Sequence, residues 1–276
     1  MAEIKGVSEL NDLKDLRVVI KSAGEMASGV AYRLVQAGFK VLTTEVPAPL
    51  AVRRAVSFCE AVHDQEKTVE GLTARLAKNV EHALKIQEKG MLPVLLDPEL
   101  TCLTEYRPKV VVDAIIAKRN TGLKKSMADL TIGLGPGFNA PDEVHLAIET
   151  NRGHNLGRLI YQGSPEPNTG VPGSMAGVTA KRVLRAPADG RFQPKCQLGD
   201  TVKEGQVLAL INEAELTAQV SGVVRGLIRP GSQVNQGLKV GDIDPRGKVE
   251  YLNTISEKAR ALGGSVLEAI MHAFNH

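Results

Sequence analysis

Apolar positions in the first part of the chain follow two patterns, short unbroken runs and runs at helical spacing. The run Arg17–Lys21 (RVVIK) is typical of a buried parallel strand, whose two faces are both apolar. Apolar residues from Ala27 to Val35 then recur at helical spacing, and Gly38 is placed to end that helix. Phe39–Glu45 predicts a second strand. Strand, helix and strand in this order predict one βαβ unit.

Predicted strands and helices continue to alternate after this βαβ unit. Apolar residues four apart predict a helix over Leu72–Ile86. Further strands are predicted at Pro93–Leu96, Val110–Ile116, Leu130–Gly133, Val144–Glu149 and Leu159–Tyr161. Strands that alternate with helices indicate an α/β fold with a Rossmann-like, mainly parallel sheet. Because the later strands have few helical segments between them, we expect extra hairpins at one edge.

The second half of the chain contains an internal repeat. Five residues reappear 32 positions later and a sixth changes conservatively, namely Ala186, Gly190, Gly199, Val202, Gly205 and Leu208 as Ala218, Gly222, Gly231, Val234, Gly237 and Val240. The repeated glycines suit turn positions with positive φ. Two copies are too few for a solenoid, so the repeat predicts a small all-β sandwich instead.

Glycine and proline mark the boundary between the halves. Seven of the 18 residues from 163 to 180 are Gly or Pro, which excludes a regular helix or strand there. We therefore expect a nucleotide-binding domain over 1–162, a linker over 163–181, an all-β module over 182–250 and a C-terminal helix within 251–276.

Composition and charge exclude several classes of protein. The 276 residues carry 34 Lys and Arg against 31 Asp and Glu, and this net charge of +3 forms no basic stripe that would indicate nucleic acid. No apolar stretch is long enough to predict a membrane span, and the first fifteen residues lack the apolar core of a signal peptide. The dispersed Cys59, Cys102 and Cys196 suit a reducing compartment. These observations predict a cytoplasmic protein.

The turn after the first strand resembles a dinucleotide fingerprint. Ser22, Gly24 and Ala27 occupy the positions of GxGxxG/A, with Glu25 inside the turn and Gly29 just beyond it. A glycine here lets the backbone approach a pyrophosphate, whose charge faces the helix N-terminus. Glu45, at the end of the next strand, stands where an acidic residue meets a ribose hydroxyl. The alternative is an ordinary tight turn whose small residues allow close packing.

Other polar residues follow the later strands. Three loops begin at the carboxyl ends of strands, where ligands collect in open α/β sheets. They contain Asp113, Lys118, Arg119 and Asn120 in the first, Gly135 and Gly137 in the second, and Arg152 and His154 in the third. Taken singly, each residue is as well explained as part of a solvated loop or an ion pair. Taken together, the loops predict one pocket, in which Arg53 and Arg54 would help to balance an anion.

The histidines and cysteines predict no metal centre, because they are dispersed and lack ligand spacing. His154 is the one evident proton donor for an acid–base reaction, although a lone histidine is more typical of a surface position. Cys59 follows an arginine pair, and a reactive thiol is one interpretation of this arrangement, but a buried, inert cysteine is the favoured one.

The repeat resembles the biotinyl/lipoyl-carrier barrel-sandwich. The matching residues are Ala186-Pro187, Gly190, Gly199-Asp200-Thr201-Val202, Gly205-Gln206-Val207-Leu208 and Ser221-Gly222-Val223. The resemblance implies a carrier lysine on the hairpin between the copies. Residues 211–217 contain no lysine, so covalent biotin or lipoate is not expected there and the module would be structural or partner-binding.

From about Leu16 to Phe274 the chain resembles the YqeB family of accessory proteins for selenium-dependent molybdenum hydroxylases, which are distantly similar to XdhC-type maturation factors. The segments that carry the resemblance are residues 23–31, 44–54, 112–120, 133–138, 149–158 and 166–170. Ser22 departs from the glycine usual in the family. The resemblance implies a role in maturing a molybdenum enzyme, with the apo-enzyme as partner.

Three functions remain open from the sequence. The first is a maturation factor that binds a molybdopterin dinucleotide or an NAD(P)-like ligand at the Ser22–Ala27 turn, with Cys59 or Cys102 as candidate carriers of sulfur or selenium. The second is an NAD(P)-dependent oxidoreductase with His154 as proton donor. The third is a non-catalytic scaffold that docks the apo-enzyme. The residues support an enzyme and a binding protein alike, and they are compatible with a homo-oligomer.

Overall fold

The computed structural model describes residues 13–171 and 173–274, which fall into two compact units. The first unit comprises residues 1–49, 57–168 and 255–276, and the second comprises 50–56 and 169–254. The C-terminal helix therefore belongs to the first unit, and a short segment from the early chain belongs to the second. The expected domain boundaries differ from the observed ones at these two segments. The local composition of a segment does not show which unit it packs against. The first twelve residues of the predicted domain lie outside the described part.

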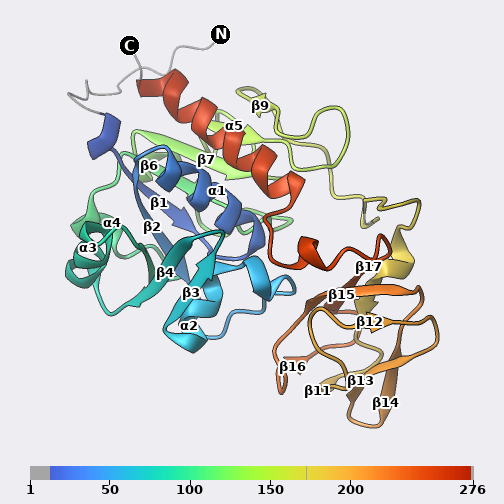
Figure 1. Cartoon of the computed structure of the whole chain (residues 1–276). Helices are drawn as coiled ribbons and strands as arrows, with labels where there is room; N and C mark the ends of the chain where they lie inside the picture. Colours follow the sequence, from blue (N-terminus) through green and yellow to red (C-terminus); the bar gives the residue numbers. More distant parts are fainter. Residues whose placement is uncertain (1–12, 172, 275–276) are drawn as a thin grey trace. The chain divides into compact units, whose positions relative to one another are not determined.

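The first unit contains a mixed sheet of nine strands (Figure 1), in the order β3-β4-β5-β2-β1-β6-β7-β8-β9. Its strands are β1 Arg17–Lys21, β2 Lys40–Glu45, β3 Glu66–Val69, β4 Leu72–Ala77, β5 Leu92–Leu96, β6 Val110–Asp113, β7 Leu130–Leu134, β8 Leu146–Ile148 and β9 Leu159–Ile160. The pairs β3–β4 and β8–β9 at the two edges are antiparallel. The pairs between β4 and β8 are parallel.

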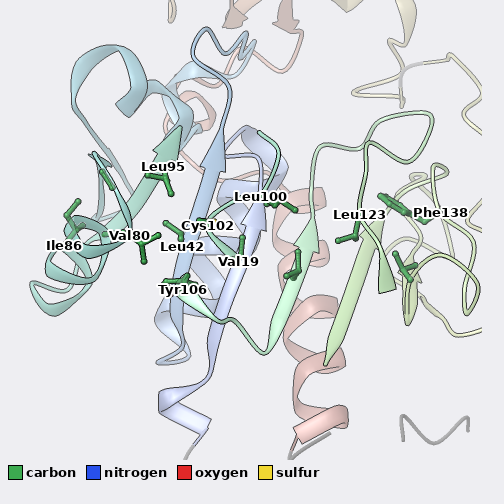
Figure 2. Close-up of a cluster of buried hydrophobic side chains, with 14 of the residues drawn as sticks. Val19, Leu42, Val80, Ile86, Leu95, Leu100, Cys102, Tyr106, Leu123 and Phe138 are labelled. Atoms are coloured by element: carbon green, nitrogen blue, oxygen red, sulfur yellow. The ribbon is translucent and has the colours of Figure 1, made fainter. Parts of the chain in front are cut away.

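Helices pack against both faces of this sheet. They are α1 Glu25–Gln36, α2 Ala61–Asp64, α3 Val80–Glu88, α4 Leu103–Tyr106 and α5 Glu257–Phe274. In Figure 1, α5 runs beside α1. Val19 and Leu42, on the central strands, share a buried cluster with Val80 and Ile86 of α3 and with Tyr106 of α4 (Figure 2). The side chain of each of these five residues is at most 4% exposed.

The contact between α1 and α5 depends on glycine. A β-carbon added to Gly29 would lie 2.6 Å from Cβ and 2.7 Å from the carbonyl oxygen of Ala259. A β-carbon on Gly263 would lie 2.7 Å from the carbonyl oxygen of Gly29. The two helices therefore approach backbone to backbone, which a larger residue at either position would prevent.

The segment Leu72–Ile86 is not one helix, as its spacing predicted. Its first part is strand β4, which pairs with β3 and β5, and its second part belongs to helix α3. Residues four apart also lie on one face of a strand, so the apolar spacing could not distinguish the two structures. Asn79 begins the helix by accepting a hydrogen bond from the amide of His82 at 2.8 Å.

The second unit consists of two antiparallel sheets of four strands each, in the orders β10-β17-β15-β12 and β14-β13-β11-β16. The strands are β10 Val183–Arg185, β11 Gly190–Pro194, β12 Thr201–Val202, β13 Val207–Ile211, β14 Ala214–Thr217, β15 Gly222–Leu227, β16 Gln233–Val234 and β17 Lys239–Asp244. Side chains of both sheets share one buried core. Each copy of the sequence repeat supplies four strands, and each sheet takes two strands from each copy.

The predicted fold class, a Rossmann-like mainly parallel sheet plus a small all-β barrel-sandwich and a C-terminal helix, is wrong. The large sheet is mixed, with antiparallel strands at both edges, and no α-helix connects β6 to β7 or β7 to β8 within the described residues. The repeat forms two separate sheets instead of one closed barrel. Local apolar patterns identified most strands, but strand direction and closure depend on pairings between distant segments.

The remaining short elements are single 3₁₀ turns. They span Leu13–Asp15, Arg54–Val56, Phe58–Glu60, Lys125–Met127, Ala180–Arg182 and Val249–Leu252. No helix among the described residues is long and apolar enough to cross a membrane.

Candidate functional site

The turn after β1 is closed by its own side chains. Ser22 has φ of 94°, and its hydroxyl accepts a hydrogen bond from the amide of Gly24 at 3.1 Å. The carboxylate of Glu45 accepts hydrogen bonds from the amides of Ala23 and Val46, each at 2.9 Å. Two amides of the turn that the fingerprint interpretation assigned to a pyrophosphate are therefore occupied, and Glu45 holds the turn in place.

A second segment covers the same turn. The amide of Cys59 donates to the carbonyl of Ala23 at 2.8 Å. The hydroxyl of Ser28 donates to the same carbonyl and accepts from the amide of Phe58. Ala27 is fully buried. These contacts match the alternative interpretation of a tight packing turn, with Glu25 as the first residue of α1.

The glycines of the turn and of the second loop have packing roles. Gly29 faces α5, as described above. A β-carbon on Gly24 would meet only the Ser22 hydroxyl, at an ordinary 3.5 Å, so no close approach requires glycine there. A β-carbon on Gly135, where φ is 93°, would lie 3.0 Å from the Thr150 hydroxyl. One on Gly137 would lie 2.7 Å from the carbonyl carbon of Arg119. These glycines bring the three predicted loops into contact.

Two buried charged residues lie at the carboxyl ends of the central strands. Lys21 of β1 and Asp113 of β6 are register partners, and they are only 6% and 1% exposed. Strand order reverses here, because the chain passes from β1 to β2 on one side and reaches β6 on the other. Such reversal points are the usual ligand sites of open α/β sheets.

Lys21 and Asp113 hold the loop of residues 114–122. The Lys21 ammonium group donates to the carbonyl oxygen of Thr121 at 2.7 Å. The Asp113 carboxylate accepts from the amide of Ile115 and from the Thr121 hydroxyl, both at 3.0 Å. Burial raises the pKa of Asp113, although its two hydrogen bonds and the charge of Lys21 act in the opposite direction.

The same loop presents two cations. Lys118 and Arg119 are exposed, and their side chains have no hydrogen-bond or ion-pair partner among the described residues. Asn120 accepts from the amides of Gly122 and Leu123 and so stabilises the turn that follows. The loop is thus fixed at both ends while its cationic tip remains available to an anion.

The third loop is also internally tied. Buried Glu149 accepts from the amides of Asn151 and Glu166, each at 2.7 Å. Arg152 forms an ion pair with Glu257 of α5. His154 is exposed, and its ring contacts no partner in the part of the chain that the structure describes. An imidazole so placed has no neighbouring group that would orient it for proton transfer.

Arg53 and Arg54 belong to the second unit. Arg53 is 3% exposed and donates to the carbonyls of Tyr251, Leu252 and Thr254. Arg54 donates to the carbonyl of Leu227 at 2.7 Å. Both arginines therefore bind main-chain carbonyls of the second unit, and their predicted role of balancing the charge of a ligand beside β1 stays a prediction.

Neither candidate sulfur or selenium carrier is exposed. Cys59 and Cys102 are free thiols at 1% and 5% exposure. Burial and the neighbouring Asp97 carboxylate raise the pKa of Cys102, so it remains a thiol at neutral pH. Across the described residues, no group of three His, Cys, Asp or Glu side chains is arranged to hold a metal ion.

Lys21 and Thr121 belong to this site but were not predicted from the sequence. The signal for Lys21 was a charged residue that ends an otherwise apolar strand, RVVIK. Thr121 gave no signal, because its carbonyl and hydroxyl meet Lys21 and Asp113 only when β1 and β6 pair.

Comparison with known proteins gives one clear sequence relative. No family model matches the chain. A protein of Escherichia coli (strain K12) named "Uncharacterized protein YqeB" is 53% identical over 254 residues, which are 92% of this chain. These residues cover 47% of that protein, so the chain spans about half the length of the curated relative it matches.

Solved structures give only weak similarity. They include the ectoine utilization protein EutE (DoeB) from Ruegeria pomeroyi, at 12% identity and a TM-score of 0.23, over 83% of this chain and 57% of that one. An aspartoacylase family protein from Mesorhizobium loti and a succinylglutamate desuccinylase/aspartoacylase from Rhodobacter sphaeroides are each 14% identical, over 83% of this chain and 85% of theirs. Their TM-scores are 0.25 and 0.26.

The names of these structures differ from what one expectation implied. The family resemblance implied structural kinship with molybdenum-cofactor and selenium accessory proteins, but the similar structures are of the aspartoacylase and desuccinylase type. TM-scores of this size carry no argument about the activity of the chain.

Proposed function

We propose that this chain is an accessory protein of the YqeB family that binds a phosphate-bearing ligand at the loop of residues 114–122. The observation that carries the proposal is the buried pair of Lys21 and Asp113, which ties this loop to the reversal point of the sheet. The loop then holds Lys118 and Arg119 toward solvent. Ammonium and guanidinium groups on a fixed loop favour phosphate through charge-assisted hydrogen bonds.

The geometry favours this site over the turn after β1. A ligand on that turn would have to displace Ser22 and Glu45 from the amides they already occupy. A ligand at Lys118 and Arg119 displaces no hydrogen bond that either side chain makes to another described residue. The absence of an orienting partner for His154 also leaves the oxidoreductase interpretation without support from the described geometry.

The accessory role rests on the family resemblance alone, and the E. coli relative supports only the likeness to YqeB. In this proposal the chain acts on a larger enzyme, and the apo-form of a molybdenum hydroxylase is the first partner to test. The three free cysteines support a cytoplasmic location, where thiols stay reduced.

The test is a thermal-shift titration of the whole chain with pyrophosphate, ATP, CTP, NAD, NADP and a molybdopterin dinucleotide. A ligand present at 100 times its Kd adds about 2.7 kcal/mol to the free energy of unfolding. We expect at least one phosphate compound to raise Tm, and the double variant Lys118→Gln/Arg119→Gln to abolish the rise. Lys89→Gln is the matched control, since it removes one exposed charge from the end of α3.

Gly24→Asp distinguishes the two sites. It places bulk and negative charge on the turn after β1, so a ligand on that turn would be lost in this variant and retained in the double variant. That result, or the absence of a shift with any compound, would overturn the proposed site. In the second case a docking scaffold would explain the chain better, and binding of the apo-enzyme would survive all of these substitutions.

A further inference from the structure

The second unit contains a cavity of about 910 Å³ that the proposed function does not use. It is lined by eleven residues, among them Arg54, Arg191, Pro194, Cys196, Leu198 and Pro230. All of these residues belong to the second unit. Cavities that bind small organic ligands have volumes of about 300–1,000 Å³, so this one is large enough.

The charged residues that line this cavity are all positive. Two arginines contribute guanidinium groups, and none of the eleven lining residues is acidic. Pro194, Leu198 and Pro230 contribute apolar surface to the remaining wall. A cavity with two cations and an apolar wall favours a ligand that combines an anionic group with an apolar body.

Both arginines lie against the same segment of the chain, which contains Leu227 and Gly231. Arg54 donates through Nε to the carbonyl oxygen of Leu227, which fixes the plane of its guanidinium group. The guanidinium group of Arg191 lies over Gly231, four residues further on. A β-carbon on Gly231 would lie 3.0 Å from its Nη2 and 3.2 Å from its Nε. Glycine, with φ of 81° here, therefore leaves room for this side chain.

Arg191 has no ion-pair or hydrogen-bond partner for its side chain among the described residues. Its neighbours in β11 are Gly190 and Phe192, which offer no carboxylate. A guanidinium group presents five N–H donors in a plane and binds phosphate or carboxylate through two of them at once. Arg191 is therefore the group that an incoming anion would meet without breaking an existing contact.

Cys196 also lines the cavity, but it is not set up as a nucleophile. Burial, with a contribution from the Asp200 carboxylate, raises the pKa of its thiol to about 11. Its sulfur lies 3.5 Å from the carbonyl oxygen of Leu208. A thiol in this state does not attack a ligand at neutral pH, so the chemistry of the cavity is binding.

We propose that this cavity binds a small organic phosphate or carboxylate with an apolar body, with Arg191 and Arg54 on the anionic group and Leu198, Pro194 and Pro230 on the body. The site lies in the second unit and depends on none of the residues of the proposed phosphate site at β1 and β6. The two proposals can therefore succeed or fail separately.

The experiment uses phenyl phosphate as the probe. It is titrated into the full 29.5 kDa chain while backbone amide signals are followed by NMR, beside inorganic phosphate and benzyl alcohol. We expect saturable shifts at Arg191, Gln193, Leu198 and Gly231 with phenyl phosphate, and at least about tenfold weaker binding by each of the other two compounds. Charge-assisted hydrogen bonds are strong enough to account for a tenfold effect.

Two variants and a control decide the outcome. Arg191→Gln should weaken phenyl phosphate binding at least about tenfold, and Arg191→Lys should restore it only in part, because an ammonium group cannot make paired hydrogen bonds. Lys203→Gln, which removes an exposed charge of the same unit outside the cavity, should leave the affinity unchanged. Equal weakening in the control, tightest binding by inorganic phosphate, or no shift at the four amides would overturn the proposal.

Discussion

Lys21 and Asp113 face each other across β1 and β6 and are joined through Thr121, whose carbonyl accepts from the lysine and whose hydroxyl donates to the aspartate. The two residues are only 6% and 1% exposed, so neither charged group can bind a ligand directly. Their role is to hold the loop of residues 114–122 at the ends of the central strands. Positioning of Lys118 and Arg119 thus depends on a buried interaction that the sequence does not display.

Removing the lysine should destabilise the first unit. We expect Lys21→Met to lower the free energy of unfolding by about 1–3 kcal/mol at neutral pH, because the Thr121 carbonyl loses its donor and the Asp113 carboxylate loses a nearby cation. In the Asp113→Asn background the same change should cost less. Urea unfolding of the four proteins in a double-mutant cycle measures the difference, and strict additivity would contradict the coupling.

The raised pKa of Asp113 predicts a particular pH dependence. The folded chain binds this proton more tightly than the unfolded chain, so its contribution to stability is present below 3.8, the ordinary pKa, and declines as pH rises through the folded pKa. Relative to the wild type, Asp113→Asn should therefore gain stability across this interval and then level off. Unfolding at a series of pH values above 3.8 checks the sign, and a difference that falls with rising pH would refute it.

Glu45 should prove to be structural. We expect Glu45→Ala to cost about 1–2 kcal/mol, because the amides of Ala23 and Val46 lose their acceptor. Binding of a phosphate compound should not change, as measured by the ligand-dependent shift in Tm. Glu88→Ala, at the exposed end of α3, is the control for removal of a carboxylate. A loss of ligand binding without a loss of stability would restore the interpretation in which Glu45 meets a ribose.

Two adjacent glycines of α5 should respond to alanine in opposite ways. Gly263→Ala should destabilise the chain by about 1–3 kcal/mol, because the new β-carbon meets the backbone of Gly29 at 2.7 Å. Gly264→Ala meets nothing within 4 Å and should stabilise the helix by up to about 1 kcal/mol through its higher helix propensity. Thermal unfolding of both variants tests the close approach of α1 and α5, and equal effects would exclude it.

In the second unit, Asp242 should be the most sensitive carboxylate. It is buried, and both Arg182 and Arg225 pair with it. Asp242→Asn leaves two buried guanidinium groups without full compensation and should cost about 3–5 kcal/mol. Glu213→Gln, on the exposed turn between β13 and β14, is the matched control and should change little. Chemical unfolding of both variants provides the measurement.

The sequence by itself determined the local elements. The apolar run Arg17–Lys21 became β1, the helical spacing after it became α1, and the repeat became two matching sets of four strands. These features follow from periodicity and from the need for glycine at positive φ, as at Gly199 and Gly231, and both act over a few residues.

Only the tertiary structure decided the rest. It showed that Leu72–Ala77 is a strand, because its neighbours β3 and β5 supply the hydrogen bonds. It assigned Glu45 to the turn, Gly29 to α5 and Arg53 to the carbonyls of residues 251–254. It also brought Lys21 to Asp113. Each of these outcomes depends on the pairing of segments far apart in the chain, which is set by the packing of the whole fold and leaves no local pattern in the sequence.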